Sequence, residues 1–525
     1  MERERVWLLD STMRDGAQGK NISFSVEDKV EILRALDRQG IPYIEAGNPS
    51  SGPKDLLFFE RARQVPLEHS KLVAFGATCR KFLAPQEDRG IAALCEAGTP
   101  AVCIFGKSWD LHVKDVLKTT LEENLRMIGE TVAYLKGQGK EVLYDAEHFF
   151  DGYRQNPRYA METVRAARDA GADWVVLCDT NGATLPSDVR RATQQVCREL
   201  GCPVGIHCHN DIGCAVAASL AAVEGGARMV QGTYVGFGER CGNANLSTVL
   251  PTLQLKMGHP CVEKEQMARL TKTARIISDV ANLTLPDSMP YVGGGAFSHK
   301  AGMHVDAVHK NSRTFEHISP DLVGNKRHIL ISEVGGKAVL YHSIRKVDPT
   351  MPPDAPEISE VLEDVKAREL RGYQYESAEA SLQVLILKHL GMHRPHFKLE
   401  LYRIFSEQEA GVFSTSSAIC KVRVGDQYEL TADEGRGPFN ALDNAVRKAV
   451  TRFYPAIARV RLTDYKVRVV EQSANSASRV RVLIESTDGE NVWTTVGVSH
   501  DIIRASLRAQ VDSLEYKLLR DDGIL

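Results

Sequence analysis

Residues 174–210, WVVLCDTNGATLPSDVRRATQQVCRELGCPVGIHCHN, contain the unit from which the fold is predicted. It holds two short apolar, β-branched runs, WVVLCDT and VGIHCHN, with a helix-length segment between them. The same unit recurs outward from this stretch, so that eight such runs begin near residues 6, 43, 71, 101, 142, 174, 204 and 229. Near-continuous apolar strands that each precede a helix are typical of a closed parallel barrel, because crossover helices bury both faces of every strand. The sequence therefore predicts an α/β fold built on a (β/α)8 TIM barrel.

Polar residues follow these runs at the points where the strands should end. They are Arg14, Asp15, Glu45, Glu147, Thr180, His207, His209 and Asn243. The carboxyl ends of all strands of a (β/α)8 barrel meet at one face, and that face carries the active site. We expect these side chains to gather there.

A histidine pair makes the strongest chemical prediction. His207 and His209 are two residues apart on a predicted strand, so both side chains point into the barrel near its open end. Asp15 follows the first strand, which neighbours the last strands once the barrel closes, and the Asn243 amide follows the eighth. These nitrogen and oxygen ligands would surround one divalent ion and leave positions open for substrate oxygens. The alternative is a pair of hydrogen-bonded core histidines without a metal.

Arg14 lies beside the predicted metal ligand Asp15. A guanidinium at this place would bind a carbonyl or carboxylate oxygen and stabilise the oxyanion that develops during an addition. The alternative is a structural ion pair with Asp15 or Glu45.

Charge and cysteine content favour a soluble, cytoplasmic protein that binds small molecules. The 65 basic and 68 acidic residues nearly balance, so we expect no nucleic-acid or membrane partner. The 11 cysteines form no closely spaced pairs, which suits reduced thiols. The N-terminal MERERVWLLD enters the first predicted strand at once, and no apolar run reaches membrane-spanning length, so no signal, transit or membrane segment is expected.

A chain of 525 residues is too long for one hydrophobic core. The regular alternation of strand and helix patterns ends after the eighth strand. We expect a catalytic barrel over residues 1–275 and a linker with small helical subdomains over residues 276–390. Residues 391–525 hold two similar passages, each with a strand, a small-residue turn and an amphipathic helix. This pattern indicates a duplicated βββα unit in an α+β domain, and such paired units commonly form effector sites.

Long motifs carry a family resemblance over nearly the whole chain. The stretch DSTMRDGAQ (10–18) resembles the first signature of the 2-isopropylmalate, homocitrate and citramalate synthases, and HCHNDIGCAVAASLAAVEGGARMVQGTYVGFGERCGNANL (207–246) resembles the second. Three further stretches are most similar to the citramalate synthase branch: DAEHFFDGY (145–153), HKAGMHVDAVHKNSRTFEHISPDLVGN (299–325) and VGVSHDIIRASLRAQVDSLEYKLL (496–519). The C-terminal region resembles the allosteric domain of that family.

The resemblance implies a Claisen-type condensation of acetyl-CoA with a 2-oxo acid, followed by thioester hydrolysis. It implies a divalent metal, Mn²⁺, Mg²⁺, Co²⁺ or Zn²⁺. Asp15, His207 and His209 match the family's metal ligands, and Asn243 matches a further ligand or close neighbour. The 2-oxo acid would chelate this ion.

The same resemblance assigns the remaining roles. Arg14 would polarise the keto oxygen, while Thr180 and Glu45 would bind the substrate. Glu147 would position the substrate and share in proton transfer, unless it only caps a helix or forms an ion pair. His304 matches the catalytic histidine, which the partner subunit of a homodimer would supply, although a surface histidine is the alternative.

Two departures bear on the substrate. Phe315 stands where the family has tyrosine, and Asn48 in EAGNPSSGPKD (45–55) replaces a large aromatic residue. Pyruvate is favoured by the branch, with the 2-oxo acids of 2-isopropylmalate, homocitrate or citrate synthases as alternatives.

Other classes fit less well. A lyase of the hydroxymethylglutaryl-CoA type would end soon after the barrel, and a biotin-dependent carboxyltransferase would need a biotinyl-lysine motif. A non-catalytic amino-acid sensor would bind ligand without releasing CoA. If the C-terminal units are regulatory, isoleucine or leucine is the expected effector.

Overall fold

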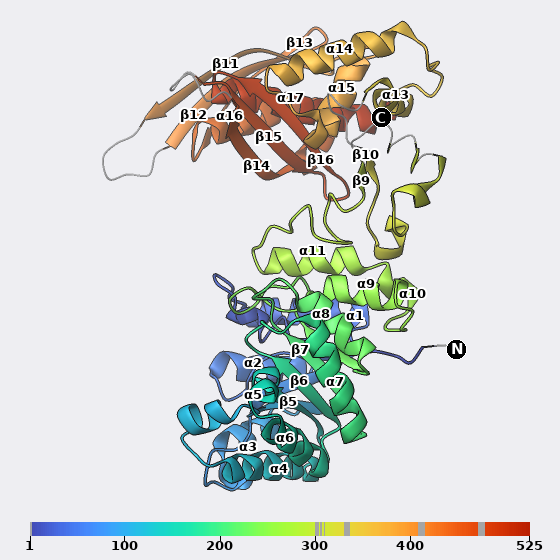
Figure 1. Cartoon of the computed structure of the whole chain (residues 1–525). Helices are drawn as coiled ribbons and strands as arrows, with labels where there is room; N and C mark the ends of the chain where they lie inside the picture. Colours follow the sequence, from blue (N-terminus) through green and yellow to red (C-terminus); the bar gives the residue numbers. More distant parts are fainter. Residues whose placement is uncertain are drawn as a thin grey trace. The chain divides into compact units, whose positions relative to one another are not determined.

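A computed structural model describes residues 3–299, 304, 307–308, 310–329, 336–407, 415–470 and 478–525. These residues form two compact units, Met1–Phe297 with Ile318–Arg327, and Ser298–His317 with His328–Leu525. Figure 1 shows the barrel strands with their helices in the first unit and the three-stranded sheets of the second. Among the described residues, none of the helices combines the length and apolar character that crossing a membrane requires.

The first unit is a closed barrel of eight parallel strands in chain order. The strands are β1 (Trp7–Asp10), β2 (Tyr43–Glu45), β3 (Lys71–Ala77), β4 (Ala101–Lys107), β5 (Glu141–Glu147), β6 (Trp174–Asp179), β7 (Val204–Cys208) and β8 (Met229–Gly232). β1 pairs with both β2 and β8, which closes the barrel. The eight apolar runs are thus the eight strands, and the predicted barrel is confirmed.

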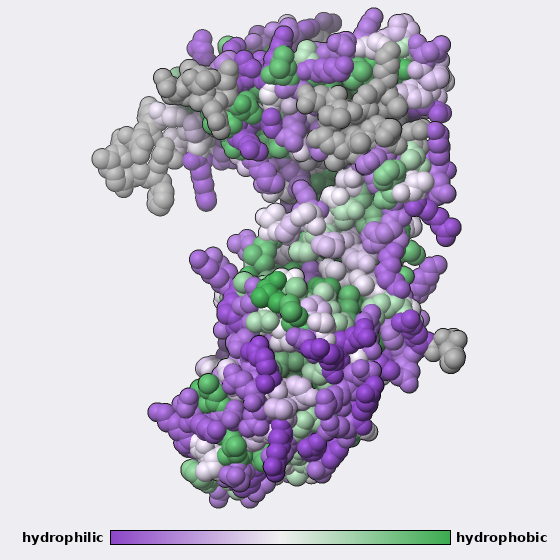
Figure 2. All heavy atoms as spheres, in the orientation of Figure 1, coloured by the Kyte–Doolittle hydropathy of each residue, from purple (hydrophilic) through white to green (hydrophobic). Residues whose placement is uncertain are grey.

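Helices surround this barrel. They are α1 (Val26–Gln39), α2 (Pro53–Ala62), α3 (Arg89–Glu96), α4 (Leu121–Gly137), α5 (Phe149–Gln155), α6 (Pro157–Asp169), α7 (Pro186–Leu200), α8 (Ala215–Glu224), α9 (Leu246–Leu255), α10 (Lys264–Met267) and α11 (Leu270–Val280). Local signals set their ends: α1 begins at a capping box between Ser25 and Asp28 and stops at Gly40, whose φ of 80° suits glycine. Hydrophilic residues predominate over α3, α4 and α6 in Figure 2, because the apolar faces of these helices pack inward.

Strand periodicity decides which side chains enter the barrel. Leu143 lies in a core cluster with Val176 and Cys178, and this cluster fills the barrel interior. Residues two positions further along the strands point the same way. The register pairs His207 with Cys178 on one side and with Gln231 on the other. The polar residues at the strand ends therefore also point into the barrel, just beyond the apolar side chains that fill its interior.

The second unit contains two βββα repeats. The first consists of β11 (Lys398–Glu407), β12 (Thr415–Val424), β13 (Gln427–Gly435) and α16 (Pro438–Thr451), and the second of β14 (Arg461–Val469), β15 (Val480–Thr487), β16 (Val492–Ser499) and α17 (Ile502–Asp521). Both first strands shift register near their start. In each repeat a third-strand threonine, Thr431 or Thr495, donates to a helix carbonyl 14 residues later. These equivalent details support the predicted duplication.

In the described part of the segment before the repeats lie α13 (Gly336–Val347), α14 (Pro356–Leu370) and α15 (Glu379–His389). Two short strands, β9 (Ser298–His299) and β10 (His328–Ile329), pair in parallel. Leu385 and Ile386 of α15 share a buried cluster with Val496 of β16 and Leu519 of α17. A cut at residue 390 would therefore divide a hydrophobic core. The three predicted domain ranges, 1–275, 276–390 and 391–525, stay a prediction.

Candidate active site

A cavity of about 190 Å³ lies at the carboxyl ends of the barrel strands. Its walls come from the segment after β1 and from the ends of five strands. The lining residues are Arg14, Asp15, Gln18, Phe75, Phe105, Asp145, Glu147, Cys178, Thr180, His207, His209 and Glu239. Six of the predicted site residues thus line one cavity at the face where parallel barrels place their chemistry.

The carboxylate and the two imidazoles of the predicted metal site lie together. Asp15, His207 and His209 are buried, and each offers a ligand atom within 4.8 Å of the others. The Asp15 Oδ2 atom is 3.5 Å from His207 Nε2 and 3.8 Å from His209 Nε2. Burial lowers the pKa of His207 to about 3 and also lowers the pKa of His209, so both rings are neutral and can donate a lone pair.

Asn243 completes this cluster. An isolated bridge pairs it with His209, and its Nδ2 atom lies 3.5 Å from His207 Nε2. Among the described atoms, Asp15 Oδ1 and Asn243 Oδ1 are buried without a hydrogen-bond partner. Buried oxygens without partners cost free energy unless something satisfies them, and a divalent cation would satisfy both. The donor set, with two imidazoles and two oxygens, fits such an ion.

Asp15 is held in its charged form. Burial opposes ionisation, but the neighbouring Arg14 guanidinium outweighs it and lowers the pKa of the Asp15 carboxyl. The carboxylate is therefore ready to act as a ligand without first losing a proton.

Gln231 orients one of the imidazoles. Its Oε1 atom lies 3.2 Å from His207 Nδ1, and its Nε2 donates to Asp145 Oδ1 at 2.9 Å. The second contact fixes the amide, so His207 Nδ1 must carry the proton and Nε2 keeps its lone pair for the metal position. Burial, together with Glu45, raises the pKa of Asp145 to about 7, while Arg14 and Gln231 act in the opposite direction.

Replacing Gln231 by leucine should lower metal affinity about 10- to 100-fold, because the imidazole loses the acceptor that fixes its tautomer. Calorimetric titration of metal into the metal-free protein measures this directly. Gln195→Leu, on the exposed side of α7, is the matched control and should bind metal normally. Equal affinities in the two variants would contradict the orienting role of Gln231.

Arg14 forms both of the ion pairs that its position allows. Its Nε donates to Glu45 Oε2 at 2.6 Å, and Nη1 donates to Asp15 Oδ2 at 2.8 Å. The guanidinium lies over the Phe75 ring at 3.8 Å from its centroid. The side chain lines the cavity, so the ion pairs position a cation there rather than remove it from the site.

Glu45 is fully buried behind Arg14. Its Oε2 atom also accepts from Ser11 Oγ at 2.6 Å. Glu45 thus fixes Arg14 from behind, and its predicted part in substrate binding would act through that guanidinium.

Glu147 and Thr180 lie on adjacent strand ends of the same cavity. Glu147 pairs with Lys107 of the neighbouring strand, directly opposite in the register. The backbone N–H of His148 donates to Thr180 Oγ1 at 2.9 Å. Because this oxygen already accepts a hydrogen bond, the hydroxyl proton is left to point at a bound anion.

His304 belongs to the second unit, where its exposed ring stacks on Phe315 with centroids 4.0 Å apart. Its role in catalysis stays a prediction. Asn48 lies in the first unit and lines a second cavity, of about 500 Å³. This cavity shares the lining residues Arg14, Phe75 and Phe105 with the cavity that contains the predicted metal ligands. The Asn48 Oδ1 atom accepts from Ser50 N at 2.9 Å.

Several residues of the site were not anticipated, and three of them form polar contacts that matter for its chemistry: Lys107, Asp145 and Gln231. A signal existed for two of them. Asp145 lies two residues before Glu147 on one strand, and Gln231 is a polar residue inside an apolar run. Lys107 is recognised only from the strand register that places it against Glu147.

The chain matches three described families in succession. Residues 5–277 match the HMGL-like family, residues 291–371 the "homocitrate synthase post-HMGL domain-like" family, and residues 376–518 the "LeuA allosteric (dimerisation) domain". The predicted resemblance to this group of synthases is confirmed.

Curated relatives match over nearly the full length of both chains. An (R)-citramalate synthase of Aquifex aeolicus is 49% identical, with 99% of this chain and 100% of the relative covered. An (R)-citramalate synthase of a Synechocystis species is 48% identical over 98% of this chain and 97% of the relative. A probable 2-isopropylmalate synthase of Methanopyrus kandleri is 32% identical, with 97% of each chain covered. The chain therefore belongs to the HMGL-like family and, within it, to the group of the (R)-citramalate synthases.

Proposed function

We propose that this chain is an acyltransferase that condenses acetyl-CoA with pyruvate and water to give (R)-citramalate and CoA. The observation that carries the proposal is the 49% identity over the whole length to a curated (R)-citramalate synthase. The barrel cavity supports it, because it combines a predicted metal site, a buried guanidinium and a carboxylate. A 2-oxo acid needs those three groups for carbonyl activation and proton transfer.

Asp15, His207, His209 and Asn243 would hold a divalent metal. When bound, this ion would supply Lewis-acid polarisation of the keto oxygen of the 2-oxo acid. Arg14 reaches the same oxygen from the Glu45 side, and its fixed fork stabilises the negative charge that develops there. The Thr180 hydroxyl donates to the substrate carboxylate.

Carbon–carbon bond formation begins with removal of a proton from the acetyl methyl group. We assign this step to Glu147 and His304, with His304 supplied by a partner subunit. The methyl carbon then bonds to the keto carbon, and the keto oxygen takes a proton to become the hydroxyl of the product. Lys107 holds Glu147 in place, so the carboxylate keeps a fixed direction toward the cavity.

Water then attacks the thioester carbonyl, the carbon–sulfur bond breaks, and the CoA thiol leaves with a proton. Phe315 cannot donate a phenolic proton in either half of the reaction. Proton transfer must therefore rely on the carboxylate and imidazole groups.

A homodimer and feedback control follow as proposals from the C-terminal family match, which bears the words allosteric and dimerisation. Isoleucine is the proposed effector, with leucine as the alternative. Because α15 shares a core with β16 and α17, removal of residues 391–525 would disturb folding as well as regulation. Addition of each amino acid to the activity assay of the intact chain is the cleaner test.

The decisive experiment is release of free CoA from acetyl-CoA by purified, metal-loaded protein. Pyruvate, 2-oxoisovalerate, 2-oxoglutarate and oxaloacetate are offered separately, and a reaction without 2-oxo acid is the blank. We expect release with pyruvate at least about tenfold faster than with the others, which corresponds to about 1.4 kcal/mol of discrimination. Faster release with another acid would reassign the substrate, and no release with any of them would overturn the proposed activity.

A further inference from the structure

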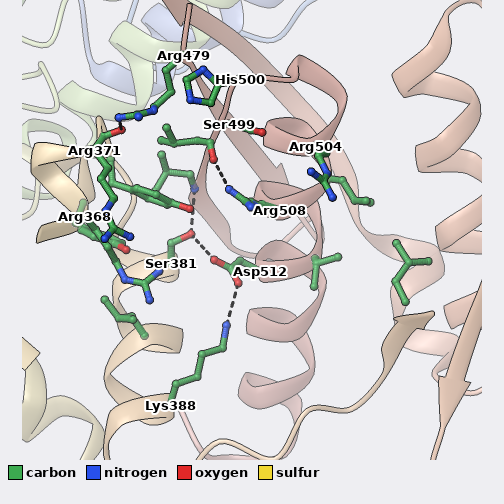
Figure 3. A pocket seen from close by; sticks show the side chains of 18 residues that line it. Arg368, Arg371, Ser381, Lys388, Arg479, Ser499, His500, Arg504, Arg508 and Asp512 are labelled. Carbon is green, nitrogen blue, oxygen red and sulfur yellow. Dashed lines mark hydrogen bonds and ion pairs between the residues drawn. The ribbon is translucent and has the colours of Figure 1, made fainter. Parts of the chain in front are cut away.

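A cavity of about 860 Å³ lies within the second unit, and none of the candidate active-site residues lines it. Its walls come from the end of α14 and the segment after it, from α15, from the start of β11, from the residue before β15, from the end of β16 and from one face of α17. Figure 3 shows these elements converging on one hollow. The volume falls in the range of about 300–1,000 Å³ that small-molecule sites occupy.

Permanent positive charge dominates the lining. Six cationic side chains take part: Arg368, Arg371, Lys388, Arg479, Arg504 and Arg508. Figure 3 shows Arg368 and Arg371 on one side, Arg504 and Arg508 from α17 on the other, and Arg479 beside His500 at one end. Asp512 is the one carboxylate among the lining residues.

Asp512 cannot neutralise this charge. Its Oδ1 is 3.4 Å from Lys388 Nζ, and its Oδ2 accepts from Ser381 Oγ at 3.0 Å. Both oxygens are thus occupied at one end of the cavity. The Arg368 guanidinium forms an ion pair with Asp364 at 2.8 Å, so its positive charge is compensated, as that of Lys388 is by Asp512.

The charges of the other four guanidinium groups are not compensated by an ion pair with a described carboxylate. Arg479 donates to the carbonyl of Arg371 at 3.1 Å, and Arg508 donates to the carbonyl of Val498. These carbonyls fix the direction of the two side chains but carry no net charge. Within the described part of the chain, no carboxylate makes an ion pair with Arg371, Arg479, Arg504 or Arg508. Like charges gathered in one hollow repel one another, so an anion would stabilise the arrangement.

The remaining wall is apolar and aromatic. Tyr373 and Tyr375 line the cavity with their rings stacked, 5.7 Å between centroids and 15° between planes. Leu385, Val496 and Leu507 add aliphatic surface. An aromatic and aliphatic wall beside a cationic one suits a ligand that has both an organic ring and several negative charges.

We propose that this cavity binds an organic polyphosphate, such as a nucleoside triphosphate. Its phosphate groups lie against the four guanidinium groups, whose planar forks match phosphate oxygens two at a time. Its ring lies against the tyrosine pair and the aliphatic wall. The site is separate from the proposed barrel chemistry and does not depend on it.

Calorimetric titration of the full-length protein tests the proposal with three probes, each with magnesium in excess: ATP, AMP and inorganic tripolyphosphate. We expect ATP to bind once per chain. AMP lacks two of the three phosphate groups and tripolyphosphate lacks the nucleoside, so both should bind at least about tenfold more weakly. Tripolyphosphate binding as tightly as ATP would overturn the role of the tyrosine wall. An AMP affinity equal to that of ATP would overturn the role of the arginines.

A charge-matched pair of variants locates the site. Arg371→Gln with Arg504→Gln alters two exposed cavity residues, whereas Arg403→Gln with Arg436→Gln makes the same charge change at exposed positions elsewhere in the unit. We expect the first pair to weaken ATP binding at least about tenfold and the second less than about twofold. Equal losses would indicate diffuse attraction and overturn the proposal.

Hydrogen exchange gives a readout that needs no substitution. Bound ATP should protect amides of residues 371–385 and 496–512 in the parent protein. Protection confined to the barrel would place the nucleotide at the active site, and absence of ATP binding would mean that the cavity is closed in the assembled protein. Either result overturns the inference, and neither depends on turnover.

Discussion

The variant His209→Ala should lose at least about 10³-fold in the rate of CoA release and should no longer retain a metal after dialysis. His209 Nε2 lies 3.8 Å from Asp15 Oδ2 in the buried cluster, so this variant removes one of the four proposed metal ligands. A Lewis acid contributes several kcal/mol to carbonyl activation, and about 4 kcal/mol corresponds to a 10³-fold change in rate.

Two measurements on one sample check this result. Metal content by elemental analysis should fall from one ion per chain to near zero, while the CoA-release rate falls in parallel. His69→Ala removes a half-exposed histidine of the first unit and should change neither quantity. A His209→Ala protein that keeps both its metal and its activity would show that the histidine pair is structural.

The second large effect is expected for Arg14→Lys, with a loss of about 10²- to 10³-fold in kcat/KM. The positive charge remains, but a lysine presents one ammonium where Arg14 uses separate nitrogens for Glu45 and Asp15. Losing a donor aimed at a developing oxyanion costs about 10²- to 10³-fold in other acyl-transfer sites.

Metal binding distinguishes this defect from the first one. Arg14→Lys should still retain metal, because the four proposed ligands are intact, and the loss should appear mainly in the chemical step. Arg158→Lys, at a highly exposed ion pair on α6, is the control and should be fully active. Activity of the Arg14→Lys protein within about threefold of the parent would contradict a role in oxyanion stabilisation.

Much of the candidate site could be predicted from the sequence, because the positions of its residues depend on their spacing along single strands and on the order of the strands. Side chains two apart on a strand share a face, so the spacing of His207 and His209 was enough to assign both to the barrel interior. The apolar runs themselves fixed the number and order of the strands. Closure then brought Asp15 beside the histidines, as the order of strands requires.

The side-chain contacts between neighbouring strands could not be predicted from the sequence. Lys107 meets Glu147, and Gln231 meets His207, only because parallel pairing sets one particular register between strands that are far apart in the chain. A periodic pattern states which face a residue occupies, but it does not state which residue lies opposite.

The barrel and the duplicated repeat follow from the hydrophobic periodicity of the sequence, and the position of polar residues at the strand ends was enough to propose a metal site there. The tertiary structure alone decided how those residues are oriented and where the arginine cavity forms. Arg371 and Arg504 are surface residues in sequence terms, and they face one hollow only because α14, α15 and α17 belong to the same compact unit. Burial, register and charge compensation depend on contacts over long distances in the chain, which no local pattern encodes.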